Sequence, residues 1–403
     1  MDRLALLGLM LLGALALGKT ARRFTIPKVS GYLVAGLLLG PSGLAAVTGR
    51  DIGEMGLISR LAIALILFDI GGELDVATVR QHGGRALLSA MLEGAVTLAL
   101  VFTVVWWVSS SVALALLLAC IAVETSPSAT ILVVKEVQAR GPFTMALLSF
   151  VAADVVIAIS AFHVSLALLG IGGPVALLQA LGGALGLGVL FGWMIGKIGS
   201  RLSTDLDLLL FVFGMLLLLQ GFSRSLGASR MIATLVCGAA AASSPAVRGR
   251  IFDILKPIAG VLYAVMFVMA GAALHLDLLR DIGKVGVAYV VTRILGKALG
   301  GLLGGAMQSE QLRRWKVLPL GLFPHAGVAI GLTLTLSELQ PALAPTVTVV
   351  VLSAVVLFEL IGPIATSACL RLAGEAGQPT DVLDLEVLEG SENGGVNNGG
   401  APR

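Results

Sequence analysis

Long apolar runs, each close to the length of a lipid-spanning helix, alternate with short polar connections along most of this chain. A bilayer core about 30 Å thick is crossed by about 20 apolar residues in a helix. The chain is therefore predicted to be an all-α polytopic membrane protein. The pattern predicts about thirteen spans, at residues 4–18, 25–42, 55–74, 84–107, 111–135, 143–170, 174–199, 206–225, 228–244, 255–276, 283–306, 315–338 and 344–371.

Composition agrees with the pattern. Of the 403 residues 57% are hydrophobic and 13% are charged, and the mean hydropathy is +0.99, whereas about a quarter of an average globular sequence is charged. The net charge of +3 is small and no long basic run occurs, so no nucleic-acid partner is expected. The three cysteines lie in apolar stretches without metal-binding or disulfide spacing. We expect no cofactor and no enzyme activity.

The two ends of the chain are interpreted differently. Residues 4–18 lack a preceding basic segment and a clear cleavage site, so we interpret them as a first span rather than a signal peptide. The stretch 374–403 is acidic and rich in glycine and asparagine, which predicts a disordered tail. We therefore expect one transmembrane domain at residues 1–373, without a soluble regulatory domain after it.

Basic residues are concentrated in alternate connections between the predicted spans. The first such connection carries Lys19, Arg22, Arg23 and Lys28. Because cytoplasmic loops of membrane proteins are enriched in lysine and arginine, these connections are predicted to face the cytoplasm. The N-terminus is then expected outside and the C-terminus in the cytoplasm.

Three landmarks recur in the second half of the chain at a near-constant offset of about 198 residues. They pair Gly40 with Gly238, Gly72 with Gly271, and Pro127 with Pro324. An odd number of predicted spans separates the two prolines, so the two copies have opposite orientations. The agreement predicts an inverted repeat, which is the architecture of many secondary transporters.

Two predicted spans are interrupted by proline. In "TSPSAT", Ser126 is a suitable N-cap and Pro127 suits the first position of a new helix. In "FPHAGVAIGL", Pro324 and His325 interrupt the twelfth span in the same way. Unwound backbone at membrane depth is tolerated where it lines a cavity within the protein. Two crossed, discontinuous helices therefore indicate a midplane ion site, although two ordinary proline kinks are the alternative.

Ionisable residues inside predicted spans are rare and usually functional. Asp154 lies well within the sixth span and is the first candidate for an ion-binding carboxylate. Lys297 is the second candidate, with snorkelling as the alternative. For Arg293, one turn earlier, snorkelling or pairing with a carboxylate is the favoured interpretation. Glu124 is assigned either to the ion or to the dipole of the half-helix.

The other polar residues are interpreted more conservatively. Thr125 and Ser126 can offer oxygen atoms to a cation, but they would look the same as helix caps. We interpret three carboxylates as packing partners and two histidines as polar core groups: Glu359, Glu93, Asp69, His163 and His325.

A carboxylate removed from water can hold a proton or a monovalent cation, but not both at once. Asp154 is predicted to be such a group, binding the cation transiently. Competition for one carboxylate, with access alternating between the two sides of the membrane, is sufficient for antiport. The residues thus favour a transporter.

Six stretches together resemble bacterial monovalent cation:proton antiporters of the Kef-type and NapA-like branch of the sodium/hydrogen exchanger superfamily. They are "IPKVSGYLVAGLLLGPSGL", "LILFDIGGELD", "TSPSAT", "AADVV", "RILGKALG" and "FPHAGVAIGL", and the resemblance covers residues 25–371. It implies a bacterial inner-membrane protein, a core domain with the ion site, a dimerisation domain, a homodimer and elevator-like movement. It also implies that Asp154 is the ion-binding aspartate, that Lys297 is the basic residue near the crossing, and that Thr125 and Ser126 form the first unwound segment.

One position departs from the family pattern. Members with electrogenic exchange have two adjacent acids, the first of which pairs with the lysine, but here the first position is Ala153. Lys297 is then expected to pair with Asp154, to pair with Glu124, or to remain neutral, and Glu124 is a candidate replacement for the missing acid. We expect one titrating carboxylate and electroneutral exchange of H⁺ for Na⁺, K⁺ or Li⁺.

Two other functions remain open on the sequence. A sodium-coupled organic-anion symporter also uses crossed broken helices, but it does not need a central lysine and aspartate. A membrane sensor or channel that does not transport by exchange is compatible with Ala153, although Asp154, Lys297 and both helix breaks are present.

Overall fold

The computed structural model describes residues 3–24, 26–48, 51, 54–73, 76–171, 173–244, 248–272, 283–308 and 314–377. All regular structure in these residues is helical. The helices of the first half are α1 (Arg3–Arg23), α2 (Lys28–Leu39), α4 (Gly56–Glu73), α5 (Val76–Ser109), α6 (Val112–Val123), α7 (Pro127–Glu136), α8 (Pro142–Leu168), α9 (Gly173–Leu178), η1 (Gln179–Gly183) and α10 (Ala184–Gly199). Those of the second half are α11 (Asp205–Ser225), α12 (Arg230–Ala242), α13 (Arg248–Ala272), α15 (Gly283–Met307), η2 (Trp315–Val317), α16 (Leu318–Gly321), α17 (Gly327–Leu339) and α18 (Ala344–Ala373).

Each of the thirteen predicted segments overlaps one of these helices or a run of two or three of them. By length and apolarity, eight helices within the described residues are able to cross a membrane, or nine if the bent helix α13 is included as one span. Three further apolar helices are shorter. The all-helical membrane architecture is therefore confirmed, whereas the number thirteen stays a prediction.

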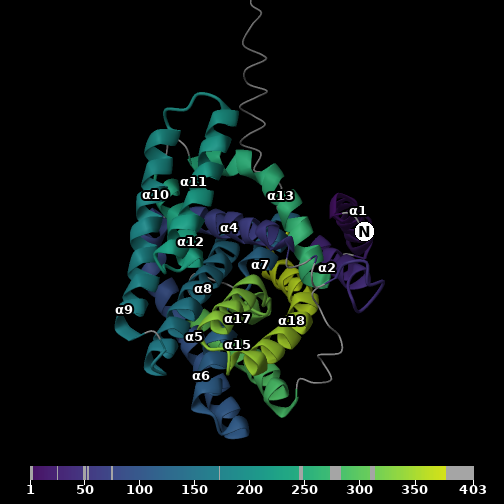
Figure 1. The fold of residues 1–403 in the computed structure, drawn as a ribbon, viewed down its shortest axis with the longest axis vertical. Coiled ribbons are helices and arrows are strands. Elements are labelled where there is room, and N and C mark those ends of the chain that lie inside the picture. The colour runs from purple at the N-terminus through teal and green to yellow at the C-terminus, as the bar shows by residue number, and fades with distance from the viewer. Residues whose placement is uncertain are drawn as a thin grey trace, which may run out of the picture.

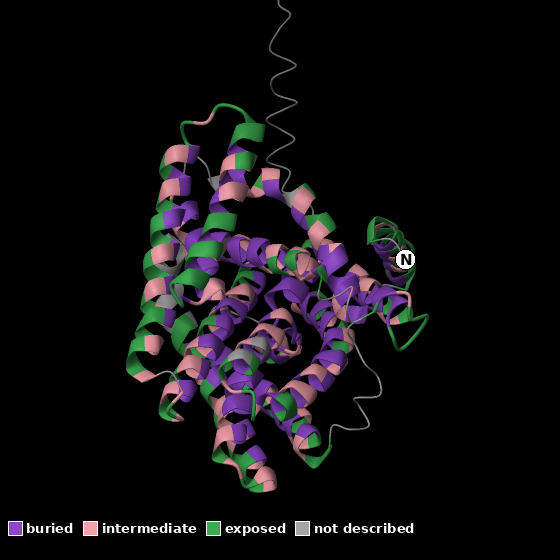
Figure 2. Cartoon of the chain, viewed as in Figure 1, coloured by how far each residue is buried: buried purple, intermediate pink, exposed green. Residues whose placement is uncertain are grey.

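The helices with broken spans lie near the middle of the molecule. In Figure 1, α7 and α17 are surrounded by the other helices, with α10 and α11 at one edge and α1 at the opposite edge. Buried residues are concentrated on the inner helices, and exposed residues on the outer ones (Figure 2). Of the spanning helices, the one that contains the first break has the largest buried share. The breaks are thus enclosed by protein, as unwound backbone in a membrane requires.

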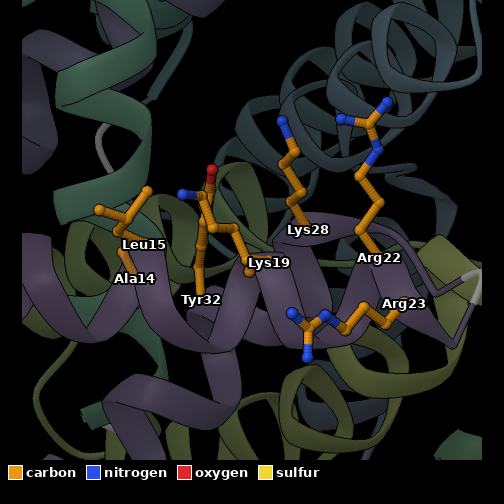
Figure 3. A pocket seen from close by; sticks show the side chains of 8 residues that line it. Ala14, Leu15, Lys19, Arg22, Arg23, Lys28 and Tyr32 are labelled. Carbon is orange, nitrogen blue, oxygen red and sulfur yellow. The ribbon is translucent and has the colours of Figure 1, made fainter.

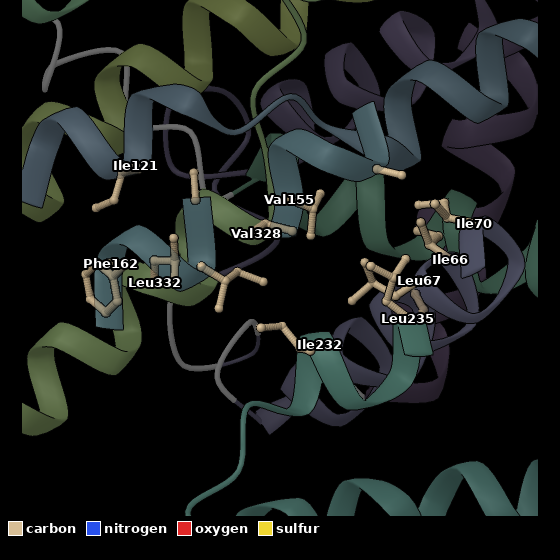
Figure 4. Close-up of a cluster of buried hydrophobic side chains, with 14 of the residues drawn as sticks. Ile66, Leu67, Ile70, Ile121, Val155, Phe162, Ile232, Leu235, Val328 and Leu332 are labelled. Carbon is tan, nitrogen blue, oxygen red and sulfur yellow. The ribbon is translucent and has the colours of Figure 1, made fainter. Parts of the chain in front are cut away.

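An apolar core fixes the broken helices against their neighbours. Figure 4 shows part of it, where side chains of α4 and α12 meet those of α6, α8 and α17. Val155 and Phe162 of α8 and Val328 of α17 belong to this cluster, and all three are buried. Since Val155 follows Asp154 directly, the same packing that buries Val155 fixes the position of that aspartate.

The long helices α5 and α15 lie in direct backbone contact. A Cβ atom added to Gly300 would lie 2.7 Å from the carbonyl oxygen of Glu93, and one added to Gly296 would lie 2.8 Å from the Cα atom of Thr97. Only glycine permits this approach, which is typical of membrane helices with small residues spaced by four. The contact brings the side chains of α5 close to Lys297 on α15.

The described chain continues into the predicted tail. The Glu375 carboxylate accepts hydrogen bonds from the backbone N–H groups of Phe143, at 2.8 Å, and Thr144, at 2.7 Å, and from the Thr144 hydroxyl. It therefore caps the N-terminus of α8, where a negative charge is stabilising. Residues 378–403 of the predicted tail lie outside the described residues.

Candidate ion-binding site

The two breaks are joined to each other. The first lies between α6 and α7, and the second lies between α16 and α17. The backbone N–H of Ser126 donates to the carbonyl oxygen of Pro324 at 2.9 Å. The hydroxyl of Thr125 lies 3.3 Å from the carbonyl oxygen of Leu322. The unwound segments thus satisfy some of each other's backbone groups, which have no water to bind at this depth.

Ser126 acts as a helix cap. Its hydroxyl oxygen accepts from the N–H of Ala129 at 3.5 Å, and Pro127 occupies the first turn of α7. Its carbonyl oxygen accepts from the Thr130 hydroxyl at 2.9 Å. The cap predicted for Ser126 is therefore present, whereas its role as an ion ligand stays a prediction.

Asp154 lies where the two breaks meet, a place that we call the crossing, and its side chain is fully buried. The same carboxylate oxygen, Oδ2, accepts from the Thr125 hydroxyl at 2.6 Å and from the Lys297 ammonium at 2.7 Å. The other oxygen, Oδ1, has no hydrogen-bond partner among the described residues. The structure thus brings together three of the residues that the sequence singled out.

Lys297 has three acceptors. Besides Asp154, its Nζ donates to the carbonyl oxygen of Val123 at 2.5 Å and lies 3.1 Å from Oε1 of Glu93. The Thr97 hydroxyl donates to the same Glu93 oxygen at 2.9 Å. Lysine and both carboxylates are fully buried. Charges in such a place persist when they are paired and hydrogen-bonded.

The interpretation of Glu93 as a packing partner near a span end was wrong. The predicted span began at residue 84, whereas the helix begins at Val76, so Glu93 lies further along it than expected. The signal that would have found it is the ladder of Gly296, Gly300 and Gly304 on α15, which marks a close partner helix. The sequence did not identify that partner as α5.

Glu124 does not replace the missing acid beside Lys297. Its Oε2 lies 2.6 Å from Nδ1 of His325, and Nε2 of His325 lies 3.0 Å from the Tyr289 hydroxyl. Within the part of the chain that the structure describes, Oε1 of Glu124 has no hydrogen-bond partner. The structure therefore places Glu124 and His325 in a second buried polar group, which links the two breaks to α15.

Arg293 is fully buried, so the expectation of snorkelling was wrong, and its hydrogen bonds among the described residues go to backbone carbonyl groups. Its guanidinium donates to carbonyl oxygens at both breaks: Ala122, in the last turn of α6, at 3.1 Å, Glu124 at 2.7 Å, Phe323 at 2.9 Å and Pro324 at 3.3 Å. The ring of Phe358 lies 4.3 Å from its central carbon. Arg293 thus holds the two breaks together.

The remaining candidates differ in their surroundings. Glu359 is fully buried, and its two carboxylate oxygens have no hydrogen-bond partner in the described ranges. Asp69 forms an ion pair with Lys135 away from this crossing. His163 bonds the carbonyl oxygen of Ile159 on its own helix at 2.8 Å, as a polar core group would.

At the crossing, oxygen atoms of carboxylate, hydroxyl and backbone carbonyl groups surround the ammonium of Lys297. Carboxylate, hydroxyl and carbonyl oxygens are the groups that replace the hydration shell of a monovalent cation. Asp154 combines such an oxygen with one that the ammonium already occupies. Lys297 has two further acceptors, the Val123 carbonyl and Glu93, besides this carboxylate.

Comparisons of the sequence with known proteins also indicate a transporter. The sequence profile of a family described as "Sodium/hydrogen exchanger, transmembrane" matches residues 8–371. The iron transporter MagA of Paramagnetospirillum magneticum is 25% identical over 307 residues, which are 72% of this chain and 68% of MagA. The glutathione-regulated potassium-efflux system protein KefC of Escherichia coli is 28% identical over 353 residues, which are 82% of this chain and 55% of KefC. The chain thus spans about half the length of KefC.

The fold is also that of a solved transporter. The structure of the sodium proton antiporter MjNhaP1 from Methanocaldococcus jannaschii at pH 8 matches with a TM-score of 0.71 and 19% identity, over 92% of this chain and 96% of that chain. An electron-microscopy structure of the same antiporter matches with a TM-score of 0.75 and 19% identity, over 94% of this chain and 99% of that chain. With the family profile covering nearly all of its length, the chain belongs to the transmembrane sodium/hydrogen exchanger family.

Proposed function

We propose that this protein is a secondary active transporter that exchanges protons for monovalent cations through Asp154. One observation carries the proposal: a fully buried carboxylate lies at the crossing of two broken helices. One of its oxygens is bound by Lys297 and Thr125, and the other has no hydrogen-bond partner among the residues that the structure describes. Broken helices at such a crossing are the usual place for substrate ions in secondary transporters.

The exchange follows from the chemistry of one carboxylate. A cation that binds Asp154 replaces the proton or the ammonium there, and the Thr125 hydroxyl and nearby carbonyl oxygens supply further ligands. A proton that binds Asp154 removes the negative charge and releases the cation. If the site opens alternately to the two sides of the membrane, the gradient of one ion drives transport of the other ion in the opposite direction.

The identity of the cation is part of the proposal. The relatives carry names that refer to sodium and protons, to potassium and to iron. The oxygen ligands around Asp154 suit a hard monovalent cation, so we propose Na⁺ or K⁺, with Li⁺ as a further candidate.

The membrane location, the topology and the assembly of the protein are part of the same proposal. We propose a multi-pass protein of the bacterial inner membrane with thirteen spans in an inverted repeat, an outside N-terminus, a cytoplasmic C-terminus and a homodimeric assembly. Residues 1–373 form its transmembrane domain. The agreement between the two crossed breaks supports the repeat, and the family membership supports the location.

The test is proton movement in everted membrane vesicles from a bacterium that lacks its own antiporters. Addition of NaCl, KCl or LiCl to energised vesicles is expected to collapse the pH gradient for the wild-type protein. Asp154→Asn keeps the size of the side chain but removes its charge, so it is expected to abolish the response. The cation that elicits the response is the substrate.

Two outcomes would contradict the proposal. A wild-type protein without a response to any of the three cations would favour the sensor or the symporter. A response that persists in Asp154→Asn would place the exchange on another group.

A further inference from the structure

Glu93 contacts the ion-binding site from α5, a helix that has no break and does not carry Asp154. Its Oε1 lies 3.1 Å from the ammonium of Lys297, and both side chains are fully buried. Thr97, one turn along the same helix, donates to the same oxygen at 2.9 Å. The glycine contacts between α5 and α15 hold the two backbones at this distance, so the pair is built into the packing.

The three protons of the Lys297 ammonium match its three acceptors: the carbonyl oxygen of Val123, Asp154 and Glu93. Binding of a cation at Asp154 would remove one of the three acceptors of Lys297. A buried ammonium left without any anionic partner would be strongly destabilised. Glu93 is the group that prevents this, because it does not have to release Lys297 when Asp154 does.

We propose that Glu93 is a positioning residue, which holds the Lys297 ammonium at the crossing while Asp154 exchanges its ligand. The inference rests on the proposed exchange at Asp154. On this inference Glu93 raises the affinity of the site for the cation through Lys297, without contacting the cation itself.

The test is the cation dependence of proton flux in proteoliposomes that contain the full chain. In Glu93→Gln, Lys297 has Asp154 as its one anionic partner, so a cation displaces it less readily. The apparent KM for the cation is expected to rise by roughly tenfold or more, the size typical of a hydrogen bond to a charged group. Glu93→Asp is expected to restore part of the affinity, and Thr97→Val to raise KM less than Glu93→Gln does.

Asp205→Asn is the matched control, because it removes a carboxylate from an exposed ion pair with Arg250. It is expected to leave KM unchanged. If wild type transports and Asp154→Asn does not, but Glu93→Gln has the wild-type KM, the role of Glu93 is refuted while the exchange stands. If wild type itself fails, the proposed function fails. Should Glu93→Gln not fold, a wild-type KM in Thr97→Val would refute the role.

A separate observation, a basic pocket between α1 and α2, carries a second inference. The pocket has a volume of about 280 Å³. Lys19, Arg22 and Arg23 from the end of α1 line it together with Lys28 and Tyr32 from the start of α2 (Figure 3). Arg22 and Lys28 extend to the same side in this view.

The pocket is formed by close packing as well as by charge. A Cβ atom added to Gly18 would lie 2.6 Å from Cε1 of Tyr32, so the tyrosine ring rests on the backbone of α1 and forms a wall. A carboxylate nearby, that of Glu136, accepts from the backbone N–H of Lys28 at 2.6 Å. Four basic side chains against this carboxylate leave an excess of positive charge.

We infer that this pocket binds the phosphodiester headgroup of an anionic lipid. A phosphate group matches the arginine and lysine side chains. The apolar part of the pocket includes Leu15, whose side chain is 54% exposed on α1. In a membrane this face contacts acyl chains, so a lipid satisfies both parts of the pocket, whereas free phosphate satisfies the basic part alone. Basic pockets between membrane helices bind anionic headgroups in this way.

The test is thermal melting of the purified full chain in detergent with added lipid. Phosphatidylglycerol is expected to raise the melting temperature more than phosphatidylcholine or sodium phosphate does. The double variant Arg22→Gln/Lys28→Gln is expected to bind phosphatidylglycerol more weakly, by about five-fold for each removed charge. The control Lys197→Gln/Arg201→Gln removes two basic residues outside the pocket and is expected to respond like the wild type.

Three results would overturn the inference: equal stabilisation by phosphatidylglycerol and phosphatidylcholine, a wild-type response of the Arg22→Gln/Lys28→Gln variant, or full stabilisation by sodium phosphate alone. The last result would assign the pocket to a free anion.

Discussion

Arg293 shows how one buried side chain can compensate for two interrupted helices. Its guanidinium reaches four carbonyl oxygens, two beside each break: those of Ala122, in the last turn of α6, and Glu124, and those of Phe323 and Pro324. Arginine suits this task because its five donors are arranged in a rigid plane and it remains charged. Without it, each of these carbonyl groups would lose a donor in a region that excludes water, and Pro324 would keep only the backbone N–H of Ser126 among the described donors. Arg293 is thus a structural requirement of the site rather than an ion ligand.

The substitution Arg293→Lys is expected to destabilise the protein. Lysine keeps the charge but has three donors on a flexible stem and lacks the planar fork of arginine, so it cannot reach all four carbonyls, and a buried carbonyl left unsatisfied costs about 1–3 kcal/mol. We expect a lower melting temperature in detergent and reduced proton flux. Arg224→Lys, an exposed arginine near the end of α11, is the control. A wild-type melting temperature for Arg293→Lys would show that other groups satisfy the carbonyls.

The sequence identified those residues of the site that stand alone in an apolar run. Asp154 and Lys297 are conspicuous because charge is rare at membrane depth. Glu93 and Arg293 were misjudged because their importance depends on contacts between distant segments: Glu93 with Lys297, and Arg293 with the carbonyls of both breaks. Such contacts are set by helix packing, which periodicity in one segment does not reveal.

At the level of elements, the contacts of glycines between helices indicate which glycines would correspond in the predicted repeat. A Cβ atom on Gly36 of α2 would lie 2.0 Å from the carbonyl oxygen of Val268 on α13, and one on Gly238 of α12 would lie 2.1 Å from that of Phe68 on α4. The two helix pairs thus use the same kind of contact. This equivalence relates Gly238 to Gly36, one helical turn from the Gly40 that sequence comparison paired with it.

The breaks themselves were well predicted, since proline and a capping serine have local effects. Pro127 begins α7 as expected, and Ser126 caps it. The second break has no side-chain cap at Ala326, and its backbone groups depend on Ser126 and Arg293 instead. The sequence of this segment alone therefore predicts an interruption, but not which groups stabilise it.

For the whole molecule, the contacts of Lys297 decide how much charge moves in a transport cycle. With a proton on Asp154 the carboxyl group is neutral, and with a monovalent cation the carboxylate and the cation together are neutral. On the proposed role of Glu93, Lys297 keeps its contacts with Glu93 and the Val123 carbonyl in either case, so it would contribute the same charge to both loaded states. The two directions of movement would then carry equal charge.

Exchange is therefore expected to be electroneutral. In proteoliposomes with equal pH and equal cation concentration on both sides, an imposed membrane potential should cause no net proton movement, whereas an imposed pH gradient should drive cation flux. A cycle that carried one net charge would respond strongly, because 100 mV corresponds to about 2.3 kcal/mol per elementary charge, or roughly fifty-fold at equilibrium. The comparison requires the wild type, with Asp154→Asn as the inactive control for leakage. Proton movement driven by voltage alone would mean that a second group, with Lys297 or Glu93 as the nearest candidates, changes its charge during the cycle.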